Sequence, residues 1–188
     1  PKWPFDKFHG ASRKLGSQMK ATGEVMSVGR NFEESLLKAV RSLEIGADHL
    51  YLKKAAAMTD RQLSEYVAKG ATDDRVFMIA ELMRRGECAK NIADVTGIDE
   101  FFLDKIRHIV QLEQQLAASG ITPDMLKECK KYGFSDKAIA RVCGKKESEV
   151  GRRAARVARE RRAAVCGKRA VRRGLAAGRL PHGRRMDA

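Results

Sequence analysis

The spacing of proline and glycine restricts the fold of this chain more than any other feature of its sequence. Proline occurs only at positions 1, 4, 123 and 181, so residues 5–122 contain no proline that would break a helix. Glycine recurs through the body at positions 46, 70, 86, 97, 120, 133 and 144. Because glycine is favoured just past the last turn of a helix, this spacing predicts a series of helices that end near glycines. The predicted fold is mainly α, an irregular helical bundle.

Capping residues mark the starts of five predicted helices. Thr59 and Gln62 form a capping-box pattern, in which each side chain can bond the backbone amide of the other residue. Thr122-Pro123 places proline at the first helical position, where its missing amide would have had no partner. The other expected caps are Asn31, Thr72 and Asp99. Behind the caps, apolar residues recur at helical spacing and are expected to face the core: Phe32, Leu36, Val40, Leu43, Leu63, Tyr66, Val67, Val76, Ile79, Ala80, Met83, Phe102, Ile106, Ile109, Val110 and Leu116.

A weak internal repeat links residues 92–97 with residues 139–144. The two segments read Ile-Ala-Asp-Val-Thr-Gly and Ile-Ala-Arg-Val-Cys-Gly, and each has an apolar residue six positions past its glycine, Leu103 or Val150. This spacing is typical of a helix-turn-helix, but a plain helical hairpin in an all-helical core has the same pattern. We favour the plain hairpin. In the second copy, four cations would lie on or near the second helix: Lys145, Lys146, Arg152 and Arg153.

The net charge of +14 is unevenly distributed along the 188 residues. Residues 1–150 carry 25 basic and 22 acidic side chains, whereas residues 151–188 carry 13 basic and 2 acidic ones. The body therefore has the charge balance of an ordinary globular domain. The strong basicity belongs to the last 38 residues, of which 26 are Ala, Gly or Arg.

The sequence contains no recognisable constellation of catalytic or ligand-binding residues. It lacks the phosphate-binding glycine loops, the HExxH zinc motif and the GxSxG nucleophile motif. The four histidines at 9, 49, 108 and 182 are scattered, and we expect His108 to lie on the surface or half-buried. We expect buried thiols at Cys88, Cys129, Cys143 and Cys166, which lack metal-ligand spacing. We therefore predict no catalytic, cofactor-binding or metal-binding residue, and no run of apolar residues is long enough for a membrane helix.

The first 30 residues differ from the helical body. Trp3, Phe5 and Phe8 alternate with polar residues as in a strand, and a loop rich in Gly, Ser and Lys follows. We expect a short strand and loop remnant that ends another domain. The chain also begins abruptly at Pro1 without a methionine, so we expect a piece of a longer protein.

Residues 18–30, which read QMKATGEVMSVGR, closely resemble the end of the first synthetase half of the large subunit of carbamoyl phosphate synthase. The segment FEESLLKAVRSLE at residues 32–44 resembles that family's following helix. Farther on, IDEFFL at 98–103, GIT at 120–122 and YGFSD at 132–136 resemble its all-helical connection domain, also called the oligomerisation domain. The resemblance extends from about Pro1 to about Arg153.

The resemblance implies three parts in this chain. Residues 1–45 would end the first ATP-grasp half, residues 46–153 would form the oligomerisation or connection domain, and residues 154–188 would form a basic tail. It also implies a cytoplasmic ligase that makes carbamoyl phosphate from bicarbonate, glutamine-derived ammonia and ATP, for arginine and pyrimidine biosynthesis. Its partners would be the remaining ATP-grasp halves, a small glutaminase subunit and further copies of itself. The parent's ATP, Mg²⁺ or Mn²⁺, and K⁺ would bind outside this chain, so we expect the fragment alone to be inactive.

The tail departs from the family, because residues 154–188 lack the aromatic residues of the family's linker. Three interpretations remain open. It could be a nucleic-acid-binding extension, since arginine-rich segments neutralise phosphates. It could be a helix to about Ala164 followed by a disordered end, or a translation of GC-rich DNA in the wrong frame.

The alternative to a connector is a helix-turn-helix nucleic-acid-binding protein with an Arg-rich arm, centred on Phe134 to Arg162. A binder of this kind would show steeply salt-dependent affinity. A connector separated from its neighbouring domains would instead expose apolar surface, so we expect self-association or marginal solubility of the isolated chain.

Overall fold

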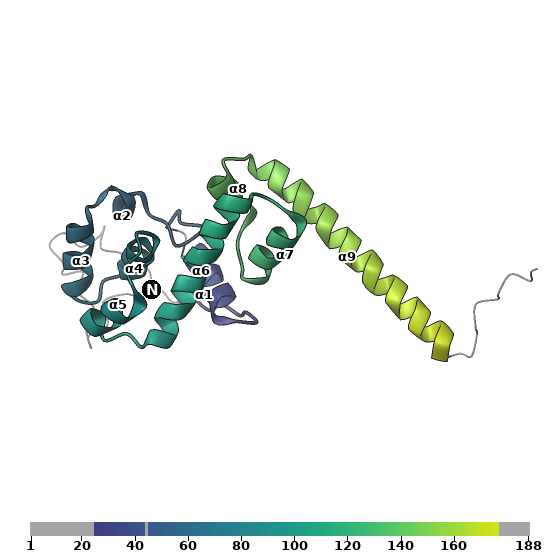
Figure 1. Cartoon of the computed structure of the whole chain (residues 1–188), viewed down its shortest axis with the longest axis horizontal. Helices are drawn as coiled ribbons and strands as arrows, with labels where there is room; N and C mark the ends of the chain where they lie inside the picture. The colour runs from purple at the N-terminus through teal and green to yellow at the C-terminus, as the bar shows by residue number, and fades with distance from the viewer. Residues whose placement is uncertain (1–24, 44, 177–188) are drawn as a thin grey trace, which may run out of the picture.

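The computed structural model describes residues 25–43 and 45–176, and in these ranges the chain forms α-helices and no strand (Figure 1). The mainly α fold is thereby confirmed. The strand expected around Trp3, Phe5 and Phe8 lies outside the described residues. The helices are α1 (Phe32–Ser42), α2 (Lys53–Ala57), α3 (Asp60–Ala68), α4 (Arg75–Arg84), α5 (Ala89–Thr96), α6 (Glu100–Ser119), α7 (Pro123–Lys131), α8 (Asp136–Cys143) and α9 (Glu147–Ala176).

The expected caps account for four of these helix starts. The Asn31 side chain accepts from the Glu34 amide at the start of α1, and Thr59 and Gln62 form the complete capping box of α3. Asp99 caps α6 in the same way. Thr122 caps α7, whose first residue is proline. These starts follow from local chemistry, because each cap satisfies an amide that has no partner inside its helix.

The start expected at Thr72 is wrong. Helix α4 begins at Arg75, after Asp74, and Asp74 makes no capping bond to it. The Thr72 hydroxyl instead donates to the Asp74 carboxylate at 3.0 Å, and the Tyr66 hydroxyl donates to the same oxygen at 2.6 Å. Residues 72–74 therefore tie α4 to α3.

Helix α6 is the central element of the fold. It packs against α1, α4, α5, α7 and α8, and Figure 1 shows α2 to α5 on one side of it and α7 and α8 on the other. Its fully buried residues include Leu103, Ile109 and Leu116. One core continues from α3 and α4 through α6 to α8 and the start of α9.

Some predicted core positions are wrong in detail. Phe102 is 43% exposed, because the inward position in the first turn of α6 belongs to Leu103. In α1 the fully buried residue is Leu37 rather than its neighbour Leu36. The helical period was read correctly, but the face was set by the neighbouring helices.

The internal repeat forms two helical hairpins, α5–α6 and α8–α9. Gly97 and Gly144 end the first helix of each hairpin in the left-handed conformation, with φ of 67° and 61°. Leu103 and Val150 are fully buried, as expected of the residue that locks the second helix.

Helix α9 leaves the body and projects from it (Figure 1). Val150 and Val157 are buried near its start, where it packs on α7 and α8. The helix continues to Ala176, so the one of the three interpretations in which it ends near Ala164 is wrong about that end. No break in the helix marks the proposed domain boundary at residue 153. The expected disorder of residues 177–188 lies outside the described residues.

Candidate functional site

Surface packing and buried ion pairs, rather than convergent reactive groups, distinguish this domain. Within the described ranges, no group of three or more His, Cys, Asp or Glu side chains could hold a metal ion. His9 and His182 lie outside these residues, and the expected lack of catalytic, cofactor and metal sites stays a prediction.

His108 is half-buried on α6, as expected for a side chain at the edge of the core. Its Nδ1 lies 2.9 Å from Glu33 Oε1, and its ring meets Tyr132 edge-on at 4.5 Å. Glu33 is almost fully buried, and its carboxylate finds a hydrogen-bonding partner in the His108 ring. This contact joins α1 to α6.

His49 is buried and held neutral. Burial, followed by the positive charges of Arg141, Arg84 and Arg41, lowers its pKa to about 3. Its Nδ1 accepts from the Leu50 amide at 2.7 Å, so its proton lies on Nε2, which has no hydrogen-bond partner among the described residues. The ring packs edge-on against Phe134 at 4.6 Å.

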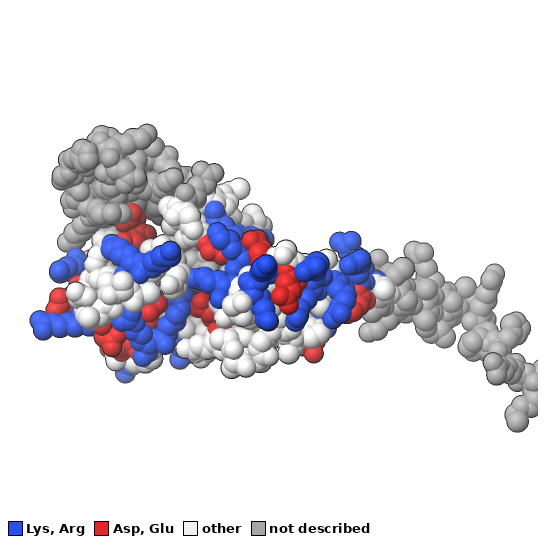
Figure 2. Space-filling view, turned by 90° about the horizontal axis from the view of Figure 1, so that it is seen from above, with Lys and Arg blue, Asp and Glu red and all other residues white. Residues whose placement is uncertain are grey.

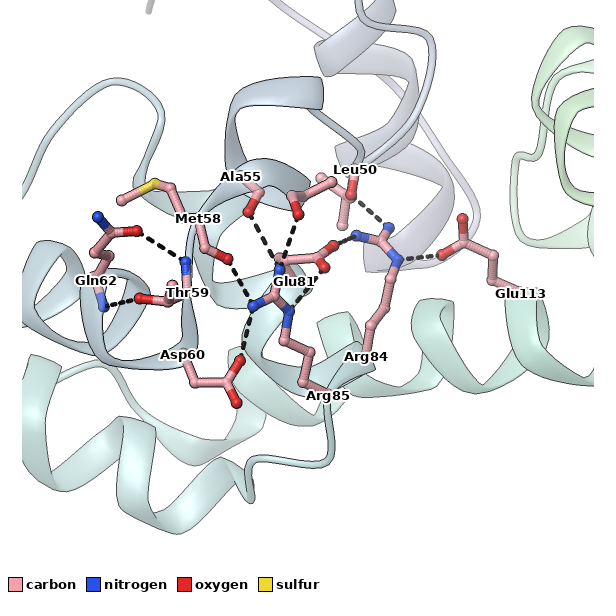
Figure 3. Close-up of polar contacts among 11 residues, drawn as sticks. Leu50, Ala55, Met58, Thr59, Asp60, Gln62, Glu81, Arg84, Arg85 and Glu113 are labelled. Atoms are coloured by element: carbon pink, nitrogen blue, oxygen red, sulfur yellow. Dashed lines mark hydrogen bonds and ion pairs between the residues drawn. The ribbon is translucent and has the colours of Figure 1, made fainter.

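Two adjacent arginines at the end of α4 connect three parts of the fold (Figure 3). Arg84 reaches α6, where its Nε donates to Glu113 at 2.8 Å, and it also donates to the Leu50 carbonyl at 2.5 Å. Glu81 lies between the arginines and bonds both, at 3.1 Å each. Arg84 therefore fixes both α6 and the loop before α2, which contains Leu50, relative to α4.

Arg85 points the opposite way, to the segment between α2 and α3. Its guanidinium donates to the Met58 carbonyl at 2.8 Å, to the Ala56 carbonyl at 3.1 Å and to Asp60 at 2.7 Å. The carbonyls at the end of α2 have no partner within that helix, so Arg85 satisfies groups that a short helix leaves exposed. The network is structural, since its charges are paired with one another.

The cysteines are only partly as expected. Cys129 is buried, and burial raises its pKa to about 12. Cys143 is half-buried, with a pKa raised by burial. The expected burial of Cys88 is wrong: it is exposed and caps α5, its Sγ accepting from the Asn91 amide at 3.4 Å. The expectation for Cys166 concerns a side chain that is not described.

An apolar groove opens on the surface beside α3, α4 and α5. Its volume is about 420 Å³, with a floor formed by Val67, Leu82 and Ile92. Two exposed polar residues, Glu65 and Asn91, also line the groove. A groove with this lining can receive an apolar side chain of another molecule.

Exposed apolar side chains also lie at the end of α5 and in the first turn of α6. Val95 lines the groove and is 57% exposed, and Phe101 is 56% exposed. Phe102 packs on the rings of both Phe101 and Phe32, at 5.3 and 5.4 Å. We call Val95, Phe101 and Phe102 with the groove the apolar corner. Sequence reasoning missed it because Phe102 was assigned to the core, although the adjacent phenylalanines gave a usable signal.

No helix in residues 25–43 and 45–176 is both long and apolar enough to cross a membrane.

Comparison with known protein families gives one match over most of this structure. A family model described as the oligomerisation domain of the carbamoyl-phosphate synthetase large chain matches residues 24–158. The match begins inside the QMKATGEVMSVGR segment and ends in α9, and it includes every helix from α1 to α8.

Proposed function

The chain belongs to the family of the oligomerisation domain of the carbamoyl-phosphate synthetase large chain, and we propose that it acts in such an enzyme as a structural connector and self-association domain. The observation that carries this proposal is the apolar corner. Val95 and Phe101 are apolar side chains exposed to water, and Val95 lines the apolar groove. Their exposure costs free energy, and this cost is removed when a second surface covers them.

The partner that we propose for the apolar corner is a second copy of this domain. The family description names oligomerisation, which requires a self-complementary surface when the assembly has two-fold symmetry. The apolar corner supplies both halves of such a contact, namely protruding side chains in Val95 and Phe101 and a groove able to receive them.

The parent enzyme in this proposal is a cytoplasmic, glutamine-hydrolysing ligase that makes carbamoyl phosphate for arginine and pyrimidine biosynthesis. It would contain two ATP-grasp halves, joined through this domain, and a small glutaminase subunit. Residues 1–45 would end the first half and residues 46–153 would form the connection.

The described residues offer no cluster of three or more His, Cys, Asp or Glu side chains for the parent's metal ions. Carboxylates such as Glu81, Glu113 and Glu34 are already paired with arginine or lysine. We therefore assign no ATP, Mg²⁺, Mn²⁺ or K⁺ site to residues 25–43 and 45–176 and derive no reaction step in them.

Paired substitutions test the surface. Val95→Asp with Phe101→Asp places two charges in the apolar corner, and we expect the self-association constant measured by sedimentation equilibrium to fall at least about tenfold, since two buried charges lack partners. The matched control is Met26→Asp with Val28→Asp, because these side chains are also apolar and exposed, at 91% and 75%, but lie outside the corner. Equal weakening by both pairs would contradict the proposed surface.

A further inference from the structure

The face of α9 that points away from the body carries a row of arginines. Figure 2 shows basic side chains along the described part of this helix, with acidic ones among them. Arg152, Arg156 and Arg159 are all exposed. Their spacing of four and then three residues places them on one side of an α-helix.

The opposite side of α9 is the one that packs on the body. Val150 and Val157 are buried there, and Ala154 is partly buried against the same core. With about 100° of rotation per residue, these positions lie across the helix from Arg152 and Arg156. The arginine row is therefore held facing outward by the packing of its own helix.

Acidic side chains neutralise only part of this charge. Glu149 pairs with Arg153 at 2.8 Å, and Glu160 pairs with Arg156 at 3.7 Å. Arg152 and Arg162 have no ion pair among the described residues. Exposed pairs of this kind contribute little free energy, so a stronger anionic partner can replace the glutamates.

We propose that this arginine face of α9 binds the phosphate backbone of double-stranded nucleic acid, without sequence specificity. At a rise of about 1.5 Å per residue, Arg152 and Arg159 are separated by about 10 Å along the helix, a distance over which a nucleic-acid strand presents more than one phosphate. Guanidinium groups bind phosphate oxygens through two parallel hydrogen bonds, which favours arginine over lysine for this contact.

The turn before α9 carries two further cations. Lys145 and Lys146 are exposed between Gly144 and the first residue of α9. The first turn of α9 carries Glu147 and Glu149, and the cations of the helix begin at Arg152 in its second turn. The α8–α9 hairpin thus presents a projecting second helix, as in helix-turn-helix proteins, where that helix lies along a groove of the duplex. This activity is additional to self-association, and it uses a different surface.

A membrane surface fits this face less well than a duplex does. Helices that lie on bilayers insert large apolar side chains between the lipids. In α9 the apolar residues Val150 and Val157 are buried in the body, while the outer face between Arg152 and Arg159 has only alanine as an apolar residue. Between Arg152 and Arg159 the charged face therefore has no large apolar side chain with which to enter a bilayer.

The test is fluorescence anisotropy of a labelled 25-base-pair duplex of arbitrary sequence, titrated with the full chain between 50 and 300 mM NaCl. The variant is Arg152→Gln, Arg156→Gln and Arg159→Gln together, which removes three charges with a residue that favours helix. The matched control is Lys53→Gln, Lys69→Gln and Lys90→Gln, which removes three exposed cations elsewhere on the body.

We expect the unaltered chain to bind with an affinity that falls steeply with salt. The arginine variant should bind at least about tenfold more weakly at 100 mM NaCl, and its log-log salt slope should be shallower by about 2 to 3, because each lost phosphate contact removes about 0.9. The lysine variant should keep the slope of the unaltered chain.

Three results would overturn the proposal. The first is no binding by the unaltered chain at 50 mM NaCl. The second is an equal loss in both triple variants, which would show attraction by overall charge alone. The third is binding to vesicles of phosphatidylserine and phosphatidylcholine without binding to the duplex.

Discussion

Gly133 is a residue at which two distant segments of the backbone approach closely. It has φ of 87°, and a Cβ added there would lie 2.8 Å from the Cα of Glu34 in α1. The carbonyl of Gly133 accepts from Arg41 at 2.8 Å, which holds α1 against the turn between α7 and α8. A side chain at this position would push these elements apart.

We therefore expect Gly133→Ala to destabilise the fold by more than the cost of placing alanine in a left-handed backbone conformation. A left-handed alanine costs about 1–2 kcal/mol, and the contact with Glu34 adds the cost of overpacking, for a total of about 3 kcal/mol. Gly86→Ala is the control, because Gly86 has φ of 98° but nothing within 4 Å of an added Cβ. Urea unfolding measures both, and equal losses would show that Gly133 and Glu34 are not in close contact.

His49 makes the stability of the fold depend on pH. Its pKa is about 3 in the folded chain, against about 6.5 in an unfolded one, so the unfolded chain binds more protons between these values. Stability is complete above about pH 6.5 and declines as the pH falls toward 3, by about 1.4 kcal/mol per pH unit from this residue.

His49→Asn removes this titration and keeps an acceptor for the Leu50 amide. We expect the variant to be less stable at pH 7, because a smaller side chain leaves a gap beside Phe134. Between pH 6 and pH 4, its unfolding free energy should fall less steeply than that of the unaltered chain. Parallel pH profiles in urea titrations would contradict the buried neutral state of His49.

At the scale of elements, Arg84 joins α4 to α6 and to the loop before α2. Arg84→Met would leave the Leu50 carbonyl without its donor and would remove one partner from each of Glu81 and Glu113, whose side chains are only 11% and 12% exposed. Breaking a buried ion pair on one side costs about 3 kcal/mol. We expect a loss of that size in urea unfolding.

Arg61→Met provides the comparison for Arg84. Arg61 and Glu65 also form a 2.8 Å ion pair, but their side chains are 89% and 51% exposed. The loss should be below about 0.5 kcal/mol, because solvent already screens the pair. If the two arginine variants lost the same stability, the α4 network would not be holding the helices together.

The elements that were predictable from sequence are those fixed by neighbouring residues. Thr59 with Gln62 and Thr122 with Pro123 act within one helical turn, so the starts of α3 and α7 could be read directly. Gly144 ends α8 for an equally local reason.

Contacts between distant segments could not be read in the same way. Arg85 lies 27 residues from its acceptor at Met58, and Arg84 lies 29 residues from Glu113. Phe102 was placed inward because its spacing fits the helical stripe, but packing against neighbouring helices selected Leu103. The apolar corner could not be predicted from the sequence for the same reason, because its position depends on how α3, α4 and α5 pack together.

At the scale of the whole molecule, two surfaces with opposite chemistry lie on separate elements. The apolar corner involves α3 to α6, whereas the arginine face belongs to α9. Self-association through the corner is driven by the burial of apolar surface, so it should persist in high salt. Binding of nucleic acid to α9 should weaken in high salt, because salt screens the attraction between charges. The salt dependence therefore distinguishes the two activities within one preparation.

Light-scattering mass measured across micromolar concentrations of the unaltered chain, at high salt, tests the proposed role most directly. The monomer has a mass of 20.9 kDa. An oligomerisation domain with an exposed apolar corner should show a mass that rises with concentration above this value, because association is governed by mass action. A mass that stays at 20.9 kDa throughout would contradict self-association by this domain.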